Sequence, residues 1–227
     1  MRLVAALALV AACSRSSDDQ PRAPSCLPPL GWSTGEATFY AADGTGNCSF
    51  EPANDRLVAA INGADYQHAS WCGACLVVSG PDSEIIVRVV DRCPGCKPGD
   101  LDLSREAFAL LAPLDTGRIP IRWLPVPCDV DGPIAYQFKD GSNPAWSAIQ
   151  LRNHRYPIER LEARDATGAY VGFARADYNY FVAPKRLGGG PYSLRVTDTR
   201  GHTLEDPQIA LGDAALRSGA AQFPRCQ

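Results

Sequence analysis

The chain has 227 residues, of which 45% are hydrophobic, and a formal net charge of −3. Such a length can bury real hydrophobic cores and favours two domains over one, which excludes a small peptide scaffold. Because 20 glycines and 19 prolines interrupt the sequence and long stretches of helical period are scarce, a mostly β protein is predicted. Neither half has the basic stripe interleaved with aromatic residues that nucleic acid requires, so no such partner is expected.

The first 13 residues have the pattern of an export signal. Arg2 precedes an apolar run over residues 3–12 that is too short to span a bilayer as mature structure, and Cys13 follows it. Residues 10–13, VAAC, are similar to the bacterial lipobox, whose cysteine is acylated. A lipid anchor at Cys13 is therefore predicted as the only contact with a membrane, and an ordinary secretory signal is the alternative. Either signal exports the protein, as a cell-surface lipoprotein or a secreted protein.

Residues 14–30 are rich in Ser, Asp and Pro and are predicted to form a flexible tether, because they cannot bury enough apolar surface to become ordered. Beyond the tether, residues 31–131 carry 14 acidic and 7 basic side chains, a net −7, whereas residues 132–227 carry 9 and 12, a net +3. The sign changes at the turn-like sequence Asp131-Gly132-Pro133. We place the domain boundary there, giving domains at 31–131 and 132–227.

The first domain is predicted to contain short strands and one short helix. Ser104 can cap the N-terminus of a helix that runs through Phe108 and Leu111 and ends at Pro113. The expected strands are residues 37–41, 75–79, 85–90 and 119–124.

The second domain shows the regular strand spacing of a β-sandwich. In the strand expected at 146–152, Ile149 and Leu151 alternate onto one face, so Trp146 and Gln150 are expected on the opposite, polar face. The other expected strands are residues 134–138, 157–164, 169–174 and 192–197.

Setting Cys13 aside leaves an even number of cysteines, in a chain that export would carry into an oxidising compartment. Two CxxC spacings would also suit zinc, but the chain has only 3 histidines, so disulfides are the more economical interpretation. No metal and no cofactor are expected. The cysteines concerned are Cys26, Cys48, Cys72, Cys75, Cys93, Cys96, Cys128 and Cys226.

Several short strings fall in the order found in expansins. In the first half they are GEATFY (35–40), CGAC (72–75), VD (90–91) and DLDLS (100–104), and in the second half FKDGSN (138–143), WSAIQLRNH (146–154) and DYNYF (177–181). Each string is weak evidence alone, but their order covers nearly the whole mature chain. The sequence therefore resembles a bacterial expansin-like protein.

This resemblance implies a fold and a function. The fold is a six-stranded double-psi β-barrel, related to family 45 glycoside hydrolases, followed by an immunoglobulin-like β-sandwich that binds carbohydrate. The implied function is binding and loosening of plant-type cell-wall polysaccharide without hydrolysis, by a monomer. Cellulose or a related β-glucan is the expected ligand, and xylan and peptidoglycan are further candidates.

The resemblance also assigns a groove on the barrel. Asp102 matches the acid of the hydrolases, Asp91 matches a second aspartate of expansins, and Thr38 lies on a facing strand. An inverting hydrolase needs a second carboxylate as base, about 6.5 to 9.5 Å from the acid. The only acidic residue near Thr38 is Glu36, one position out of register on an alternating strand, so no hydrolysis is expected.

The second domain is implied to stack aromatic side chains on sugar rings. Trp146 and Tyr178 match two of the family's surface aromatics, and Lys139 matches a basic residue beside them. Ala145 replaces a tryptophan of some members, which shortens this platform, and Tyr180 is a candidate to extend it. Some bacterial expansins carry a tyrosine two residues after the Asp91 position. This chain has a cysteine there, so one stacking contact is either missing or supplied by Trp71.

The positions of four cysteines resemble paired cysteines of plant expansins. Cys48 is therefore predicted to pair with Cys72, and Cys75 with Cys128. Cys93 and Cys96 are predicted to pair across their short turn, which leaves Cys26 and Cys226 as the last pair.

Two other functions remain open. Rare lipoprotein A has the same barrel and cleaves peptidoglycan strands, and DR (91–92) and DLS (102–104) also resemble its motif. That family relies on an upstream histidine, for which His68 is the candidate. The second domain favours expansins over it, and the third hypothesis is a wall-binding adhesin without loosening activity. The net −7 of the barrel favours a neutral glucan over anionic polymers.

Overall fold

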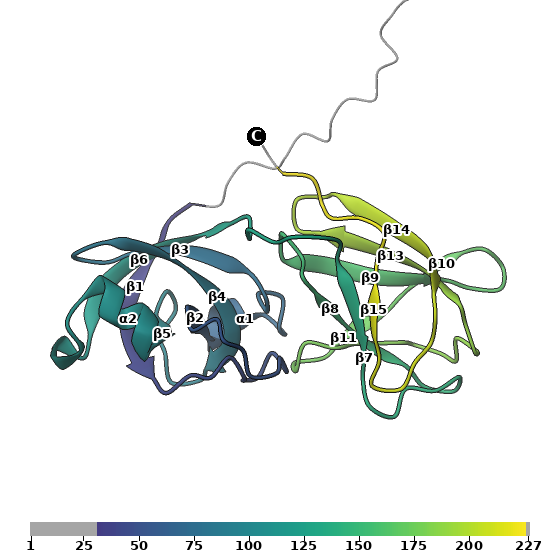
Figure 1. Cartoon of the computed structure of the whole chain (residues 1–227), viewed down its shortest axis with the longest axis horizontal. Helices are drawn as coiled ribbons and strands as arrows, with labels where there is room; N and C mark the ends of the chain where they lie inside the picture. Colours follow the sequence, from purple (N-terminus) through teal and green to yellow (C-terminus); the bar gives the residue numbers. More distant parts are fainter. Residues whose placement is uncertain (1–30, 226–227) are drawn as a thin grey trace, which may run out of the picture.

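The computed structural model describes residues 31–225. The expected export signal, lipid anchor at Cys13, tether and Cys26–Cys226 pair therefore lie outside the described residues. A barrel and a sandwich lie side by side along the longest axis of the molecule (Figure 1). Within residues 31–225, no helix has the length and apolar character needed to cross a membrane.

The barrel is built from six strands that close in the order β1-β5-β2-β4-β3-β6. β1 runs parallel to β5 and β2 runs parallel to β4, whereas the other neighbours are antiparallel. The strands are β1 (Ser33–Tyr40), β2 (Val58–Asn62), β3 (Cys75–Ser79), β4 (Glu84–Cys93), β5 (Leu101–Ser104) and β6 (Ile119–Val126).

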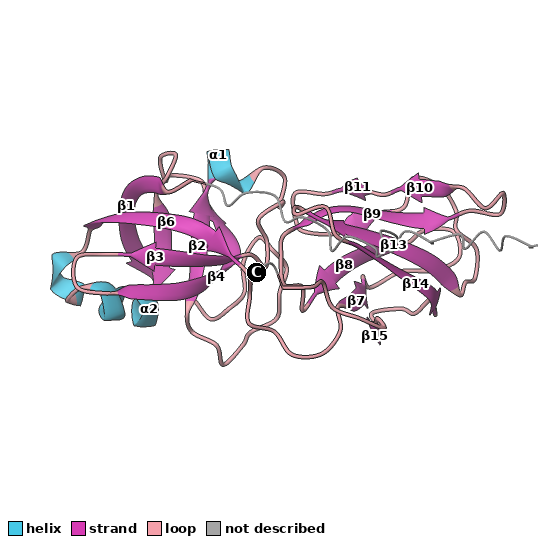
Figure 2. Ribbon diagram, turned by 90° about the horizontal axis from the view of Figure 1, so that it is seen from above, coloured by secondary structure: helices cyan, strands magenta, loops and turns pink. Residues whose placement is uncertain are grey.

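Two short helices, α1 (Gly63–Tyr66) and α2 (Arg105–Leu111), lie on opposite sides of these strands (Figure 2). The hydroxyl of Ser104 accepts a hydrogen bond from the backbone N–H of Ala107 at 3.1 Å, so the predicted cap is present. Phe108 and Leu111 are fully buried against the barrel. A 3₁₀ turn, Leu114–Thr116, follows α2.

The second domain is a sandwich of two antiparallel sheets with the orders β10-β9-β13-β14 and β11-β12-β8-β7-β15. A single buried apolar cluster, which includes Tyr136, Leu161 and Val196, fills the space between them. The strands are β7 (Ala135–Phe138), β8 (Ala148–Arg152), β9 (Ile158–Arg164), β10 (Tyr170–Gly172), β11 (Ala174–Arg175), β12 (Phe181–Val182), β13 (Tyr192–Asp198), β14 (Thr203–Ile209) and β15 (Leu216–Ser218).

The mostly β fold is confirmed, but several strands were not predicted. β2 is buried at all five positions and so shows no alternation, and β5 is only four residues long and leads directly into α2. The single strand expected at 169–174 is divided between β10 and β11, which belong to different sheets. β6 ends and β7 begins on either side of residue 131, where the boundary was placed.

The expected strand position of Trp146 was wrong. β8 begins only at Ala148, and Trp146 lies before it in a tight turn bridged to Asn143. Ala148 and Gln150, which share the face assigned to Trp146, are fully buried. The barrel domain packs against this face of β8. Alternation along one strand shows which side chains share a face, but not which domain packs against that face.

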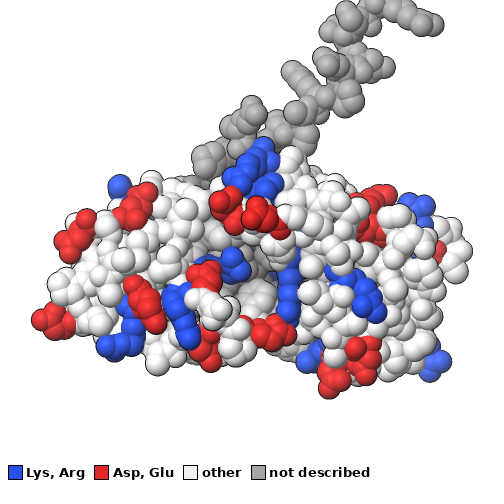
Figure 3. Space-filling view, viewed as in Figure 1, with Lys and Arg blue, Asp and Glu red and all other residues white. Residues whose placement is uncertain are grey.

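Polar side chains of the sandwich bind the barrel segment at residues 47–51. Gln150 donates from Nε2 to the carbonyl oxygen of Cys48 at 2.8 Å, and Asn179 donates from Nδ2 to the same oxygen at 3.1 Å. Arg152 pairs with Glu51, with 2.6 Å between Nη1 and Oε2. Figure 3 shows the hollow between the two domains, with basic and acidic residues on its rim.

A second barrel segment, residues 66–73, also binds the sandwich. The hydroxyl of Tyr66 donates to the carbonyl oxygen of Asp177 at 2.6 Å, and Nδ1 of His68 lies 2.5 Å from the carboxylate of Asp177. Arg175 donates from Nη1 to the carbonyl oxygen of Ala69 at 2.9 Å. The two domains are therefore fixed relative to one another by several separate contacts.

Three disulfides are present in the described residues: Cys48–Cys72, Cys75–Cys128 and Cys93–Cys96. They are the three pairs that were expected there. Cys48–Cys72 joins the two barrel segments that bind the sandwich. Cys75–Cys128 ties β3 to the connection between the domains.

A buried histidine lies at the contact between the domains. Gly73 adopts φ +77°, and a Cβ there would lie 2.7 Å from Nε2 of His154, so this position requires glycine. Nδ1 of His154 lies 2.8 Å from the carbonyl oxygen of Tyr156. The pKa of His154 is lowered to about 4, mainly by burial and to a smaller extent by nearby Arg175 and Arg88, whereas the hydrogen bond to that carbonyl opposes the shift.

We expect His154 to make folding stability depend on pH. Since its pKa is lower in the folded state than in the unfolded chain, its stabilising effect is complete above about pH 6.5 and is lost as the pH falls towards 4, by about 3 kcal/mol in all. Melting temperatures measured from pH 7 to 4 should therefore fall less steeply for His154→Gln than for the wild type. Equal slopes for wild type and His154→Gln would contradict this.

We predict that Cys26 pairs with Cys226. This bond would close a loop spanning both domains and would stabilise the fold by about 5 kcal/mol in the loop-entropy model. Peptide mapping under non-reducing conditions should recover the two cysteines in one linked peptide. Recovery of Cys26 joined to a cysteine of the barrel would refute the pairing.

Candidate functional site

Strand pairing places the predicted groove residues in one row across the outside of the barrel. Thr38 on β1 is opposite Asp102 on β5, Asp102 is opposite Ala60 on β2, and Ala60 is opposite Asp91 on β4. Residues next to them in sequence, such as Leu101 and those at 37, 59, 61 and 103, are fully buried in the barrel core. We call Thr38, Asp102, Ala60 and Asp91 the groove row. Its two carboxylates stand on either side of the small methyl group of Ala60.

Asp102 on β5 is hydrogen-bonded to β1, the neighbour of β5 on the side away from β2. The hydroxyl of Thr38 donates to Oδ1 of Asp102 at 2.6 Å, a short bond of the kind made to a charged acceptor. This bond fixes the direction of the carboxylate, because Thr38 itself sits on a paired strand. The relation between Asp102 and Thr38 that was expected from the sequence is therefore present.

Tyr40 is a site residue that the sequence analysis missed. It lies two residues after Thr38 on β1 and so points to the same side of the strand. Its hydroxyl oxygen is buried, with no hydrogen-bond partner among residues 31–225. Burial, together with Asp91 and Asp102, raises the pKa of Tyr40, so this hydroxyl stays protonated. Alternation from Thr38 was the signal that could have identified it.

Asp91 is held by backbone N–H groups. Its Oδ1 accepts hydrogen bonds from the N–H of Asn47 at 2.6 Å and of Arg92 at 2.8 Å. Gly46 passes so close that a Cβ there would lie 2.4 Å from the carboxylate carbon of Asp91. Asn47 in turn donates from Nδ2 to the carbonyl oxygen of Asp177 at 2.9 Å. Asp91 is thus linked through one residue to the sandwich domain.

The expectation that Glu36 is out of register was wrong. Glu36 and Thr38 are two residues apart on β1, so both point outwards, and both line a hollow of about 380 Å³ beside the groove row. The Glu36 carboxylate is paired with Arg118, with 2.9 Å between Oε2 and Nη1. Glu36 therefore lies on the same face of the barrel as Asp102, but Arg118 already forms an ion pair with one of the Glu36 carboxylate oxygens.

The sandwich presents two of the predicted aromatic side chains to solvent. Trp146 and Tyr178 are 38% and 39% exposed. Nζ of Lys139 lies 5.5 Å from the ring centre of Tyr178 and 4.9 Å from that of Tyr180. Tyr180 is only 7% exposed and packs 5.9 Å from Tyr178, so it supports the surface and does not extend it. We call Trp146, Tyr178 and Lys139 the aromatic platform.

Two candidates do not join the groove row. Trp71 lines a cavity between the domains and packs edge-on against Trp123 at 6.0 Å, so it does not replace the contact that is missing at Cys93. His68, the candidate catalytic histidine of the peptidoglycan hypothesis, is 81% exposed and engages Asp177 of the sandwich. No cluster of three or more metal-binding side chains is found in residues 31–225.

Comparison with known proteins decides the family. A family model described as Lytic transglycolase matches residues 33–123, the barrel. Expansin-YoaJ of Bacillus subtilis is 36% identical over 180 residues, covering 75% of this chain and 77% of that protein. The chain belongs to the expansin family. Expansin-like protein 3 of Dictyostelium discoideum is 30% identical over 74% of this chain and 53% of its own length.

Solved structures agree over both domains. The crystal structure of the apo expansin from Clavibacter michiganensis matches with a TM-score of 0.80 and 32% identity, over 86% of this chain and 99% of that one. A mutant of the same expansin, in complex with cellohexaose, matches equally well. Expansins are non-enzymatic wall-loosening proteins, and the expected double-psi barrel followed by a sandwich is confirmed.

We expect the aromatic platform to provide most of the binding to crystalline cellulose. Replacing Trp146 and Tyr178 together by alanine should weaken binding at least several-fold, since each lost ring contributes about 0.5 to 1.5 kcal/mol beyond burial if sugar faces behave like aromatic partners. Depletion isotherms measure the change, and circular dichroism checks folding. Leu216→Ala, at another exposed apolar residue of the sandwich, is the control and should bind normally. Unchanged affinity of the folded double variant would place binding elsewhere.

Proposed function

We propose that this expansin binds a neutral β-glucan, cellulose or a related chain, along a surface that includes the groove row and the aromatic platform, and loosens plant-type wall polysaccharide without cleaving it. The observation that carries this proposal is the link from Asp91 through Asn47 to Asp177, the residue before Tyr178. It joins the Asp91 carboxylate of the barrel to the backbone of the sandwich next to Tyr178. The cellohexaose complex of the Clavibacter relative supports a β-1,4-glucan as ligand.

The aromatic platform and the groove row have different chemistry, which supports different roles in function. Aromatic faces stack on the apolar faces of sugar rings and suit a neutral, flat ligand. The groove row instead offers oriented carboxylates, which accept hydrogen bonds from sugar hydroxyls. We assign binding mainly to the platform and loosening to Thr38, Asp91 and Asp102 of the groove row. The protein would act as an exported monomer, anchored through Cys13 or released.

A second function has one specific observation in its favour. The family model that matches the barrel is described as a lytic transglycolase, and Asp102 is a single acid that could protonate a glycosidic oxygen. Against it, His68 points to Asp177 of the sandwich, and the match to expansins extends over both domains. Cleavage of peptidoglycan, wall adhesion without loosening, and binding to xylan are therefore outcomes to be distinguished by experiment.

We expect Asp102→Asn to bind cellulose almost as well as the wild type but to lose any wall-weakening effect. The substitution keeps the shape of the side chain and the bond to Thr38 while removing the negative charge. Extension of plant wall strips under constant load measures loosening, and depletion isotherms measure binding. Asp115→Asn, a carboxylate elsewhere on the barrel, is the control and should behave as wild type.

The same variants test the absence of cleavage. The wild type should release no soluble sugar from cellulose, xylan or peptidoglycan in a reducing-end assay. Release of fragments that is abolished by Asp102→Asn would defeat the non-enzymatic proposal. If Glu36→Gln also abolished the release of fragments, Glu36 would be identified as the base, despite the ion pair between Glu36 and Arg118.

A further inference from the structure

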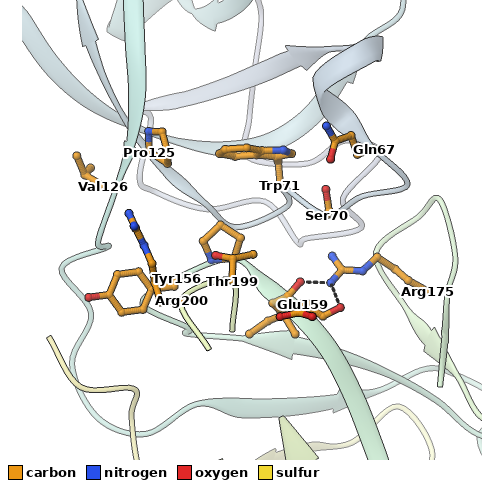
Figure 4. A pocket seen from close by; sticks show the side chains of 12 residues that line it. Gln67, Ser70, Trp71, Pro125, Val126, Tyr156, Glu159, Arg175, Thr199 and Arg200 are labelled. Atoms are coloured by element: carbon orange, nitrogen blue, oxygen red, sulfur yellow. Dashed lines mark hydrogen bonds between the residues drawn. The ribbon is translucent and has the colours of Figure 1, made fainter. Parts of the chain in front are cut away.

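A cavity of about 340 Å³ lies between the two domains and is separate from the groove row and the aromatic platform, none of whose residues lines it. On the barrel side it is bounded by the segment after α1 and the end of β6. On the sandwich side it is bounded by the start of β9, by β11 and by the turn after β13 (Figure 4). Its volume is at the lower end of the range of small-molecule sites, which suits a single ring better than an oligosaccharide.

The walls of this cavity are flat and largely apolar. The indole of Trp71 forms one side, and Tyr156 lies across from it (Figure 4). Trp71 is held edge-on by Trp123 at 6.0 Å, so its face is fixed before any ligand arrives. Pro125 and Ile158 also line the cavity. A rigid indole beside aliphatic side chains is a surface on which a six-membered ring can stack.

Arg175 brings a positive charge to the cavity, where backbone carbonyls bind its guanidinium. Its Nη1 donates to the carbonyl oxygen of Ala69 at 2.9 Å, its Nη2 donates to that of Ile158, and its guanidinium lies 4.5 Å from the ring centre of Phe181. No carboxylate in residues 31–225 forms an ion pair with it, and burial lowers the pKa of Arg175 to about 10. Buried charges are ordinarily paired, so this guanidinium lacks an anion.

A second polar group at the same place lacks a partner. The hydroxyl oxygen of Ser70 is buried and forms no hydrogen bond to any described residue. Ser70 follows Ala69, whose carbonyl Arg175 binds, so the hydroxyl and the guanidinium meet at one end of the cavity (Figure 4). The lining also includes the polar side chains of Gln67 and Thr199, and Glu159, whose carboxylate is paired with Arg160. A cation without a paired carboxylate, beside a hydroxyl without a partner, suits the carboxylate of a ligand, and Gln67 and Thr199 suit ring hydroxyls.

We propose that the interdomain cavity binds a hexuronic acid, with its carboxylate on Arg175 and Ser70 and its ring against Trp71. This site is additional to the neutral glucan surface of the proposed function and does not depend on it. A hydroxycinnamic acid offers the same combination of ring and carboxylate from a different source. Gln67 and Thr199 in the lining favour the sugar, because they can form hydrogen bonds to ring hydroxyls that an aromatic acid mostly lacks.

The test is titration of the intact protein with D-glucuronate, its methyl ester, D-glucose and p-coumarate. Binding is measured by calorimetry and by the change in tryptophan fluorescence. D-glucuronate should bind saturably with a millimolar dissociation constant. The methyl ester and glucose should bind at least about tenfold more weakly, because they cannot form the charge-assisted bonds to Arg175. Saturable binding of p-coumarate in preference to glucuronate would overturn the assignment to a sugar acid.

Variants locate the site. Arg175→Gln should weaken binding of glucuronate at least about tenfold. Because Arg175 also binds three backbone carbonyls, those of Ala69, Ile158 and Glu159, Thr199→Trp is a second variant. Thr199 lies on an exposed turn, and the larger ring should fill the cavity and abolish binding. Arg186→Gln, which removes an exposed arginine of the same domain, is the matched control for charge and should bind normally.

Trp146→Ala separates this site from the proposed function. It should weaken cellulose binding and keep glucuronate binding, whereas Thr199→Trp should keep cellulose binding and lose glucuronate binding. The inference is overturned if glucuronate does not bind saturably, if its methyl ester binds equally well, or if the folded Thr199→Trp protein binds it with unchanged affinity.

Discussion

The Cys48–Cys72 disulfide determines how the two domains of this expansin meet. It joins two loops of the barrel, and those loops receive the polar side chains of the sandwich: Gln150 and Asn179 on Cys48, and Arg175 on Ala69. Neither loop is a strand of the barrel, although Cys48 and Gly73 donate from their backbone N–H groups to carbonyl oxygens of β4. The disulfide adds a covalent link between the two loops. Cross-linking them lowers the entropy that would otherwise oppose these contacts. The relative position of the groove row and the aromatic platform therefore depends on a bond that lies in neither.

The groove row itself follows from strand order. In the closed order β1-β5-β2-β4, strands distant in sequence become neighbours, and residues 38, 102, 60 and 91 come into one line. Each of the two carboxylates has its own donors: the Thr38 hydroxyl for Asp102 and two backbone N–H groups for Asp91. The protonated hydroxyl of Tyr40 stands near both. This arrangement presents hydrogen-bond acceptors along a line, which suits a chain of hydroxylated rings.

Much of this could be predicted from the sequence. Strings such as GEATFY and WSAIQLRNH identified the family, and with it the barrel, the sandwich and the Cys48–Cys72 and Cys75–Cys128 disulfides. Ser104 was recognised as a helix cap because capping depends only on local residues. The residues that were misjudged depend on distant partners. Trp71 and Gln150 were interpreted without knowing that the other domain lies against them. Glu36 is an exception, because alternation from Thr38 along β1 already places both side chains on one face.

The several interdomain contacts have a consequence for the shape of the polymer. Since the barrel and the sandwich are held in one orientation, the two halves of the surface cannot turn to follow a curved or coiled chain. A stiff, straight polymer already has the shape this surface requires and loses little conformational freedom on binding, whereas a flexible polymer would have to be straightened first. The rigidity of the protein would thus select polymers by persistence length as well as by the identity of their sugars.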